Sequence, residues 1–187
     1  MMSSRIITTA VVLFCMTTVA TNVRGEVIDA DSNGFTVRSE TTVAADRLAV
    51  YVASVANIGE WWSSDHTVSG NAANLYIDAS LPGCFCETLG QGTGLVHMAV
   101  TFVNPGVMLR LTGGLGPLGL MGVTGNMTWE FDEVDGVTAV TLQYAVGGYM
   151  PGGLDTIAAA VDGVLIEAMQ RLKLFVETGS PEAPEND

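Results

Sequence analysis

The sequence predicts an α+β fold in which a curved antiparallel sheet surrounds one long C-terminal helix. The segments before residue 153 alternate apolar and polar residues, as strands with one buried face do. Residues 153–178 instead repeat apolar residues at helical spacing, and their buried stripe is Leu154, Ile157, Ala158, Val161, Val164, Leu165, Ala168, Met169, Leu172 and Phe175. A sheet that closes on this helix buries both apolar surfaces.

The two ends of the chain are expected to lie outside this domain, which spans residues 26–178. Residues 1–25 have the pattern of a secretory signal peptide, with Arg5 before an apolar run and compact residues at a cleavage site. The run is interrupted by threonines and is shorter than the about 20 residues of a membrane anchor. We therefore expect cleavage before Glu26, export to the periplasm or the medium, and no stable membrane anchor afterwards. Residues 179–187 are too polar and proline-rich to pack and are expected to form a disordered acidic tail.

Local patterns predict the order of elements within the domain. Residues 26–33 are expected to be a loose lead-in, residues 34–43 a half-buried strand, and residues 44–56 a helix followed by a helical turn at 60–62. A meander of antiparallel strands follows, with strands expected at residues 66–69, 74–79, 84–89, 95–103, 107–112, 127–131 and 140–146. Asn104-Pro105-Gly106 and Asp135-Gly136 are turn signals between them.

Charge and cysteine content limit the possible partners. The formal net charge is −13, so the chain has no basic patch with which to bind nucleic acid or an anionic membrane surface. Cys84 and Cys86 are the only cysteines after the signal segment, too few for a disulfide scaffold. On a regular strand their Cα atoms lie about 6.6 Å apart, at the upper limit for a bridge. Free thiols are therefore predicted, because a disulfide requires a local kink.

Several segments, together with the order of elements, resemble one superfamily. The segments are GEWWSSDHTVSG (59–70), NLYID (74–78), PGCFCETL (82–89), HMAVTFVNPGVMLRLTGGLGPL (97–118), GNMTWEF (125–131) and VDGVLIEAMQRLKLFVE (161–177). They resemble the START-like or SRPBCC superfamily of helix-grip domains, which includes polyketide cyclase/dehydrase proteins and homologues of the heat-shock-protein-90 ATPase activator. The resemblance implies a helix-grip fold with a hydrophobic ligand cavity between the sheet and the C-terminal helix. It implies no fixed catalytic set, so the catalytic residues stay unknown and no cofactor is expected.

The inward phase of each strand and of the helix gives candidate walls for this cavity. Val96, Met98, Val100 and Phe102 are predicted to share the inward face of their strand. The candidate ligand-binding residues are Trp61, Trp62, Phe85, Glu87, Met98, Val100, Leu109, Trp129, Tyr144, Leu165 and Met169. The aromatic members also suit a packed core.

Three polar or glycine-rich features have alternative interpretations. Glu87 either follows Phe85 inward, as an acid–base or anchoring group, or reaches solvent where the strand ends or bends, and solvent is preferred. His66 and His97 fit no zinc spacing with the cysteines, so no metal site is expected, and His97 is placed on the polar side of its strand. Residues 114–119 read GLGPLG but lack the context of a nucleotide loop, and apolar residues 115–121 suit a lip at the cavity entrance or a plain connection.

The sequence therefore predicts an exported protein that binds a small hydrophobic molecule between sheet and helix. An enzyme of cyclase or dehydratase type acting on a similar molecule is the alternative. A buried polar group beside Glu87 favours the enzyme, and a dry apolar cavity favours the carrier.

Overall fold

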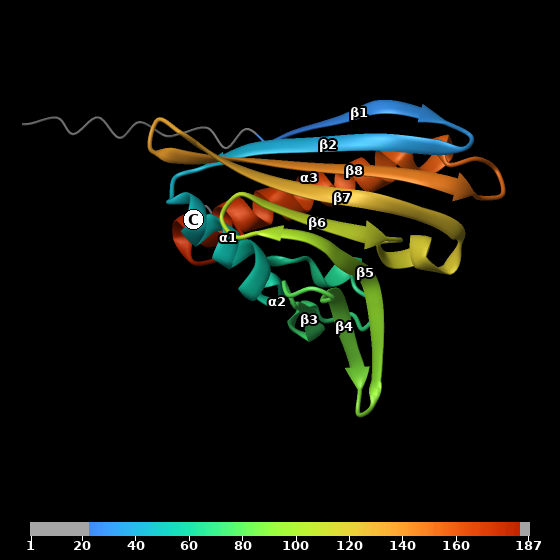
Figure 1. Cartoon of the computed structure of the whole chain (residues 1–187), viewed down its shortest axis with the longest axis horizontal. Helices are drawn as coiled ribbons and strands as arrows, with labels where there is room; N and C mark the ends of the chain where they lie inside the picture. The colour runs from blue at the N-terminus through green and yellow to red at the C-terminus, as the bar shows by residue number, and fades with distance from the viewer. Residues whose placement is uncertain (1–22, 184–187) are drawn as a thin grey trace, which may run out of the picture.

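A computed structural model describes residues 23–183, and the predicted arrangement of one sheet around one long helix is confirmed (Figure 1). Within these residues, three α-helices and three short 3-10 helices accompany eight strands. The helical elements are α1 (Arg47–Ala56), α2 (Ile58–Trp61), η1 (Ser64–His66), η2 (Ala72–Asn74), η3 (Gly116–Leu120) and α3 (Asp155–Thr178). The strands are β1 (Arg24–Asp31), β2 (Gly34–Val43), β3 (Leu75–Ile77), β4 (Cys84–Gly90), β5 (Thr93–Asn104), β6 (Met108–Gly113), β7 (Gly122–Val134) and β8 (Val137–Tyr149).

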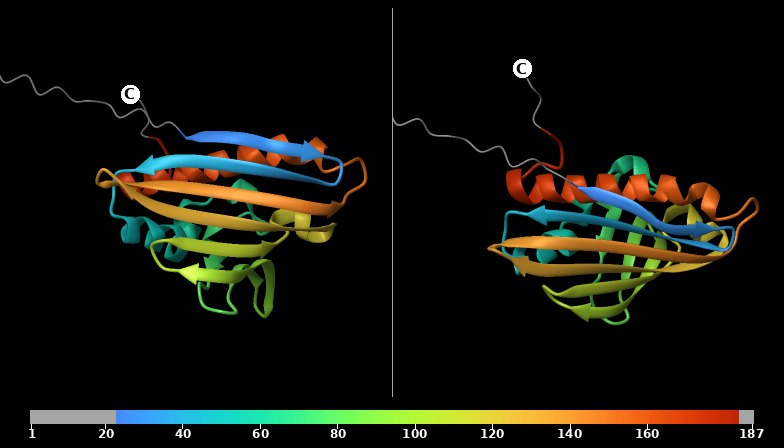
Figure 2. Two further views of the ribbon diagram at one scale, coloured as in Figure 1. Left: turned by 45° about the horizontal axis from the view of Figure 1, so that its top comes forward. Right: turned by 90° about the horizontal axis from the view of Figure 1, so that it is seen from above.

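All eight strands form one antiparallel sheet in the order β1-β2-β8-β7-β6-β5-β4-β3. The sheet curves so that α3 lies across its concave side, packed against β1 and β2 (Figure 2). The β4–β5 hairpin bends away from the long strands (Figure 1).

Local sequence signals explain most of the element boundaries. The Asp46 carboxylate accepts hydrogen bonds from the backbone N–H groups of Leu48 and Ala49, at 2.9 and 3.2 Å, and so caps the start of α1. Asp135 and Gly136 both have positive φ, 52° and 80°, which closes the β7–β8 hairpin as the sequence predicts. Gly179 has φ 81° and ends α3 in the left-handed conformation.

Two sequence-based assignments are wrong. Residues 26–33, expected to be a loose lead-in, form most of β1 and its turn into β2, because backbone pairing with β2 holds even this polar, largely exposed segment. Residues 66–69, expected to be a strand, instead comprise the last residue of η1 and irregular backbone at 67–69. The N–H groups of Val68 and Ser69 donate to the Glu87 side chain rather than to a neighbouring strand.

The predicted signal peptide and acidic tail extend beyond the part of the chain that the structure describes. Residues 1–22 and 184–187 lie outside the described residues. Strand β1 starts at Arg24, and Arg24 and Gly25 pair with Glu40 and Ser39, so cleavage before Glu26 removes the first two residues of β1. Within residues 23–183, none of the helices has the length and apolar character needed to cross a membrane.

Strand β5 contains two bulges that change which residues face inward. Phe85 pairs with Met98 while Cys86 pairs with Val96, so His97 is an extra residue on β5. A second irregularity leaves Thr101 extra between the pairs of β5 with β6. The predicted strict alternation is therefore wrong at both ends of β5: Val96 is 61% exposed and Phe102 is 39% exposed.

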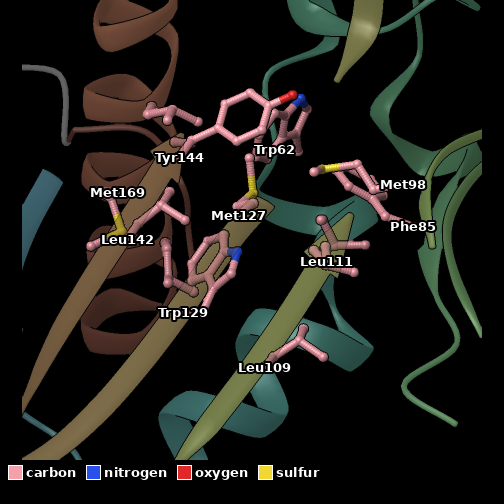
Figure 3. Close-up of a cluster of buried hydrophobic side chains, with 14 of the residues drawn as sticks. Trp62, Phe85, Met98, Leu109, Leu111, Met127, Trp129, Leu142, Tyr144 and Met169 are labelled. Carbon is pink, nitrogen blue, oxygen red and sulfur yellow. The ribbon is translucent and has the colours of Figure 1, made fainter. Parts of the chain in front are cut away.

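The centre of the molecule is a continuous hydrophobic core between the concave side of the sheet and α3 (Figure 3). Trp129 stacks on Phe131 with ring centroids 6.4 Å apart, and Trp61 meets Trp129 edge-on at 6.2 Å. Helix α3 contributes the fully buried side chains of Leu165, Met169 and Leu172. The predicted inward face of α3 is confirmed at these positions.

Two basic side chains attach the C-terminal half of α3 to the rest of the fold. The Lys173 ammonium is buried, donates to the carbonyl of Thr42 at 2.6 Å and pairs with Glu177 at 2.7 Å. The Arg171 guanidinium donates to the carbonyl of Trp61 at 2.7 Å. These contacts fix the C-terminal end of the helix.

Candidate functional site

The main apolar pocket of the described residues lies beside the N-terminal half of α3. Its volume is about 360 Å³, within the usual range for small-molecule sites. Residues 62–68, residues 115–121, one face of α3 and His97 of β5 line it. We call it the lip pocket, and its lining residues are Trp62, Asp65, His66, Thr67, Val68, His97, Leu115, Gly116, Pro117, Leu118, Met121, Ile157, Ala160, Val161 and Val164.

The α3 wall of the lip pocket is a stripe that adjoins the core-facing stripe. Ile157, Ala160, Val161 and Val164 follow the i, i+3, i+4, i+7 spacing of one helix face. Leu165 follows directly and faces the core, where it is fully buried. The apolar surface of α3 is thus wider than the core requires, and its surplus forms a wall of the pocket.

Residues 115–121, which we call the lip, form the opposite wall. Its backbone is held at Leu115, whose N–H donates to the Tyr144 hydroxyl at 3.1 Å, while that hydroxyl donates to the carbonyl of Gly113 at 2.9 Å. Burial raises the pKa of Tyr144, which keeps the hydroxyl protonated and able to donate. Leu118 is buried under the lip, whereas Leu120 is 91% exposed on its outside. The glycine-rich segment thus lines the pocket as the lip interpretation expects.

A buried Glu87–His97 pair forms the polar part of the wall. The bulge in β5 turns His97 inward, so its side chain is 3% exposed and that of Glu87 is fully buried. The ring Nε2 of His97 lies 2.9 Å from a Glu87 carboxylate oxygen. Phe85 packs against the imidazole with ring centroids 5.3 Å apart and fixes its position. The expectation that His97 lies on the polar side is wrong, because the bulge breaks the alternation on which it rested. The expectation that Glu87 reaches solvent where the strand ends or bends is also wrong, because its carboxylate is buried.

The carboxylate of Glu87 is ionised and held in place by backbone donors. Burial raises the pKa of Glu87, but hydrogen bonds from Ser69, Val68 and His97 outweigh this effect, so the pKa lies below its ordinary value. The N–H groups of Val68 and Ser69 donate to its two oxygens at 3.0 and 2.5 Å. Glu87 therefore holds both the pocket segment 67–69 and the His97 ring.

The second histidine of the chain lines the same pocket and also has a glutamate partner. His66 Nε2 lies 3.0 Å from a carboxylate oxygen of Glu167 on α3. This pair is more exposed, with 31% and 42% of the two side chains accessible. Burial raises the pKa of Glu167, but hydrogen bonds from Ser63 and His66 and the nearby charges of His66 and Arg171 bring it below its ordinary value. The two pairs differ mainly in their access to water.

The sequence-predicted site residues all lie in the interior, but mostly outside this pocket. Trp62 lines it, and Glu87 and Tyr144 support it from behind through His97 and the lip. The others pack in the adjoining core: Trp61, Phe85, Met98, Val100, Leu109, Trp129, Leu165 and Met169. Figure 3 shows Trp62, Phe85 and Met98 gathered in this core beside Tyr144.

Sequence reasoning did not place residues 65–68 and His97 in the pocket wall. Irregular backbone and a bulge place them, and neither has a periodic signal. One signal was available for α3, where the apolar stripe was broader than one sheet contact needs. Among residues 23–183, no group of three or more His, Cys, Asp and Glu side chains converges as metal ligands do.

Cys84 and Cys86 form a disulfide, so the prediction of free thiols is wrong. Their Cα atoms are 5.4 Å apart, inside the range that a bridge requires. The pairing of β4 with β5 is irregular between Phe85 and Cys86, which is the local kink that a regular strand lacks. The bridge therefore lies next to Glu87 and opposite the His97 bulge.

The chain has a START-like helix-grip fold, which several solved structures share. EF2215, a conserved protein of unknown function from Enterococcus faecalis, is similar with a TM-score of 0.59 at 13% identity, over 90% of this chain and 82% of that one. CalU16 from Micromonospora echinospora has a TM-score of 0.55 at 13% identity, over 86% and 88%. The Aha1 dimer from Colwellia psychrerythraea has a TM-score of 0.52 at 15% identity, over 77% and 97%. At these identities the likeness establishes the fold. No protein-family model and no curated protein matches the sequence.

Proposed function

We propose that the protein binds a small hydrophobic molecule in the lip pocket. The observation that carries this proposal is a pocket of about 360 Å³ whose wall is mostly aliphatic and aromatic. Leu115, Leu118 and Met121 on the lip face Ile157, Val161 and Val164 on α3 across it. A molecule with a mainly apolar surface gains free energy by leaving water for such a wall.

Binding of an apolar fluorescent probe, N-phenyl-1-naphthylamine, tests the proposal. Ala160 and Ala159 are adjacent exposed alanines on α3, but only Ala160 lines the pocket. Ala160→Trp should fill the pocket and weaken probe binding about tenfold or more, a loss of roughly 1.4 kcal/mol. Ala159→Trp adds the same side chain away from the pocket and should leave binding unchanged. Equal effects of the two substitutions, or no probe binding to the parent protein, would contradict the proposal.

One observation favours a second candidate, an enzyme of cyclase or dehydratase type. It is the ionised Glu87 hydrogen-bonded to His97 in the pocket wall, since a carboxylate that orients an imidazole is a common acid–base arrangement. Native mass spectrometry of protein purified from its own host should reveal a bound molecule. Incubating that molecule with fresh protein separates the candidates, because an enzyme changes its mass or retention time and a carrier does not.

We also propose that the protein is exported. The signal-peptide pattern of residues 1–25 supports this, and the Cys84–Cys86 disulfide suits an oxidising compartment. N-terminal sequencing of protein recovered outside the cytoplasm should give a start at or near Glu26. An intact N-terminus in that fraction would contradict processing.

A further inference from the structure

The orientation of one histidine determines which polar group the pocket accepts. In the 3.4 Å contact between the backbone N–H of Gly116 and Nδ1 of His97, the N–H can only donate, so Nδ1 must be unprotonated. The ring proton is therefore on Nε2, where it donates to the ionised Glu87 carboxylate at 2.9 Å. Glu87 thus fixes the tautomer whose acceptor lone pair is on Nδ1.

This lone pair lies at the pocket wall and is only weakly used. His97 and Gly116 both line the pocket, so the Nδ1 atom between them is next to the space that a ligand would fill. The contact with Gly116 is longer than the usual 2.7–3.2 Å of a good hydrogen bond. Because the His97 side chain is 3% exposed, water has little access to it. A ligand donor that reached Nδ1 at a shorter distance would improve on this contact.

The remaining charges of the pocket disfavour an anionic ligand. Within residues 23–183, its lining contains Asp65 and no lysine or arginine. The Glu87 carboxylate lies directly behind His97, and the Glu167 carboxylate directly behind His66. A ligand carboxylate would face these negative charges and an acceptor nitrogen, so the pocket offers it no donor at His97.

We propose that the pocket selects an apolar molecule with a neutral hydroxyl, such as a phenol, enol or alcohol, which donates a hydrogen bond to Nδ1 of His97. This inference rests on the proposed binding function and specifies its ligand class. Fatty acids and other carboxylates are excluded from that class. Glu87 is a positioning residue, since it acts on the ligand only through the ring that it orients.

Three probes that share one ring system separate this inference from the proposed function. 2-Methoxynaphthalene measures apolar binding alone, 2-naphthol adds the hydroxyl donor, and 2-naphthoate adds a negative charge. By isothermal titration calorimetry, 2-naphthol should bind up to about tenfold more tightly than 2-methoxynaphthalene, because its hydroxyl replaces the long contact from Gly116 with a shorter hydrogen bond, and 2-naphthoate should bind most weakly. Equal binding of the first two, or tightest binding of 2-naphthoate, overturns the inference and leaves the proposed function standing. No binding of any probe overturns both.

Matched variants of the two histidines show which of them accepts the hydrogen bond from the ligand. In His97→Gln the amide nitrogen can still donate to Glu87, while the acceptor at the Nδ1 position is lost; His66→Gln makes the same change in front of Glu167. The preference for 2-naphthol over 2-methoxynaphthalene, measured within each variant, should disappear in His97→Gln and persist in His66→Gln. The reverse pattern overturns the inference.

Nitrogen NMR of the unmodified protein provides a test that needs no variant. Nδ1 of His97 should have the shift of an unprotonated ring nitrogen at neutral pH. 2-Naphthol should move this shift, and 2-methoxynaphthalene should not. A protonated Nδ1 in the free protein, or no response to 2-naphthol, overturns the inference.

Discussion

The space beside α3 is filled with side chains on one side of the helix and partly open on the other. On the core side, Leu165, Met169 and Leu172 meet large side chains such as Trp129 and Leu142, and all five are buried. On the pocket side, Ala160 and Val161 face a lip that contains Gly116 and Pro117, and about 360 Å³ stays open. One helix therefore both completes the core and forms a binding wall, because small residues and a bulged strand replace large side chains on one side.

Truncating a core side chain should produce the largest effect. Leu165→Ala removes a fully buried side chain and should lower the free energy of unfolding by about 2–5 kcal/mol. Val161→Ala borders the pocket and should cost about 1 kcal/mol or less, since its neighbours already leave space. Urea unfolding measures both, with exposed Gln170→Ala as the control. Equal losses for Leu165→Ala and Gln170→Ala would mean that the buried face of α3 is misassigned.

Enlarging a side chain should give the opposite contrast between the two regions. Val100 is buried in the core, so Val100→Trp should overpack it and cost about 1–3 kcal/mol. Val161→Trp projects into the open pocket and should change stability by less than about 0.5 kcal/mol while blocking probe binding. If Val100→Trp left stability unchanged and abolished probe binding, the binding space would lie in the core rather than in the lip pocket.

The disulfide should make a smaller contribution. The bridge closes a very short loop between Cys84 and Cys86, so its removal by Cys84→Ala with Cys86→Ala should cost roughly 1–2 kcal/mol. Mass spectrometry of the peptide that contains both cysteines, taken without reductant, should show the bridged form. Two free thiols in that peptide would contradict the kinked geometry of β4.

The smallest expected effect is a change in pH dependence. The pKa of Glu87 is lowered in the folded state, so its stabilising contribution is present above the ordinary carboxyl value of 4.5 and is lost as pH falls through the folded value. Glu87→Gln removes this titration and should flatten the acid side of the stability curve by at most about 1.4 kcal/mol per pH unit. Unfolding at a series of pH values measures the difference. Parallel curves would mean that Glu87 titrates alike in the folded and unfolded states.

Sequence periodicity predicts the packed region far better than the pocket. The buried stripe of α3 and the alternation of β7 and β8 follow directly from the spacing of apolar residues, because an element with one buried face repeats apolar residues at its own structural period. Helical spacing also identifies α1 and the turn at α2. The resemblance to helix-grip domains adds the topology, which the structure confirms.

The pocket depends on departures from periodicity, which single-sequence patterns do not reveal. The bulge at His97 moves that ring inward and Val96 outward, and it accompanies the kink that joins Cys84 to Cys86. The segment 67–69 is irregular and is held by the Glu87 carboxylate, a contact between residues about twenty positions apart. Such features arise from tertiary hydrogen bonds, so unbroken alternation misplaced His97, and an expected strand end or bend misplaced Glu87.

The most direct test of the contrast between core and pocket is to locate a bound apolar probe by NMR. Intermolecular nuclear Overhauser effects from 2-methoxynaphthalene should reach the methyl groups of Leu118 and Val161, which line the pocket. They should be absent from Met127 and Leu142, which are packed in the core and labelled in Figure 3. Contacts to Met127 and Leu142 without contacts to Leu118 and Val161 would contradict the account, because the ligand would then lie between sheet and helix in the core.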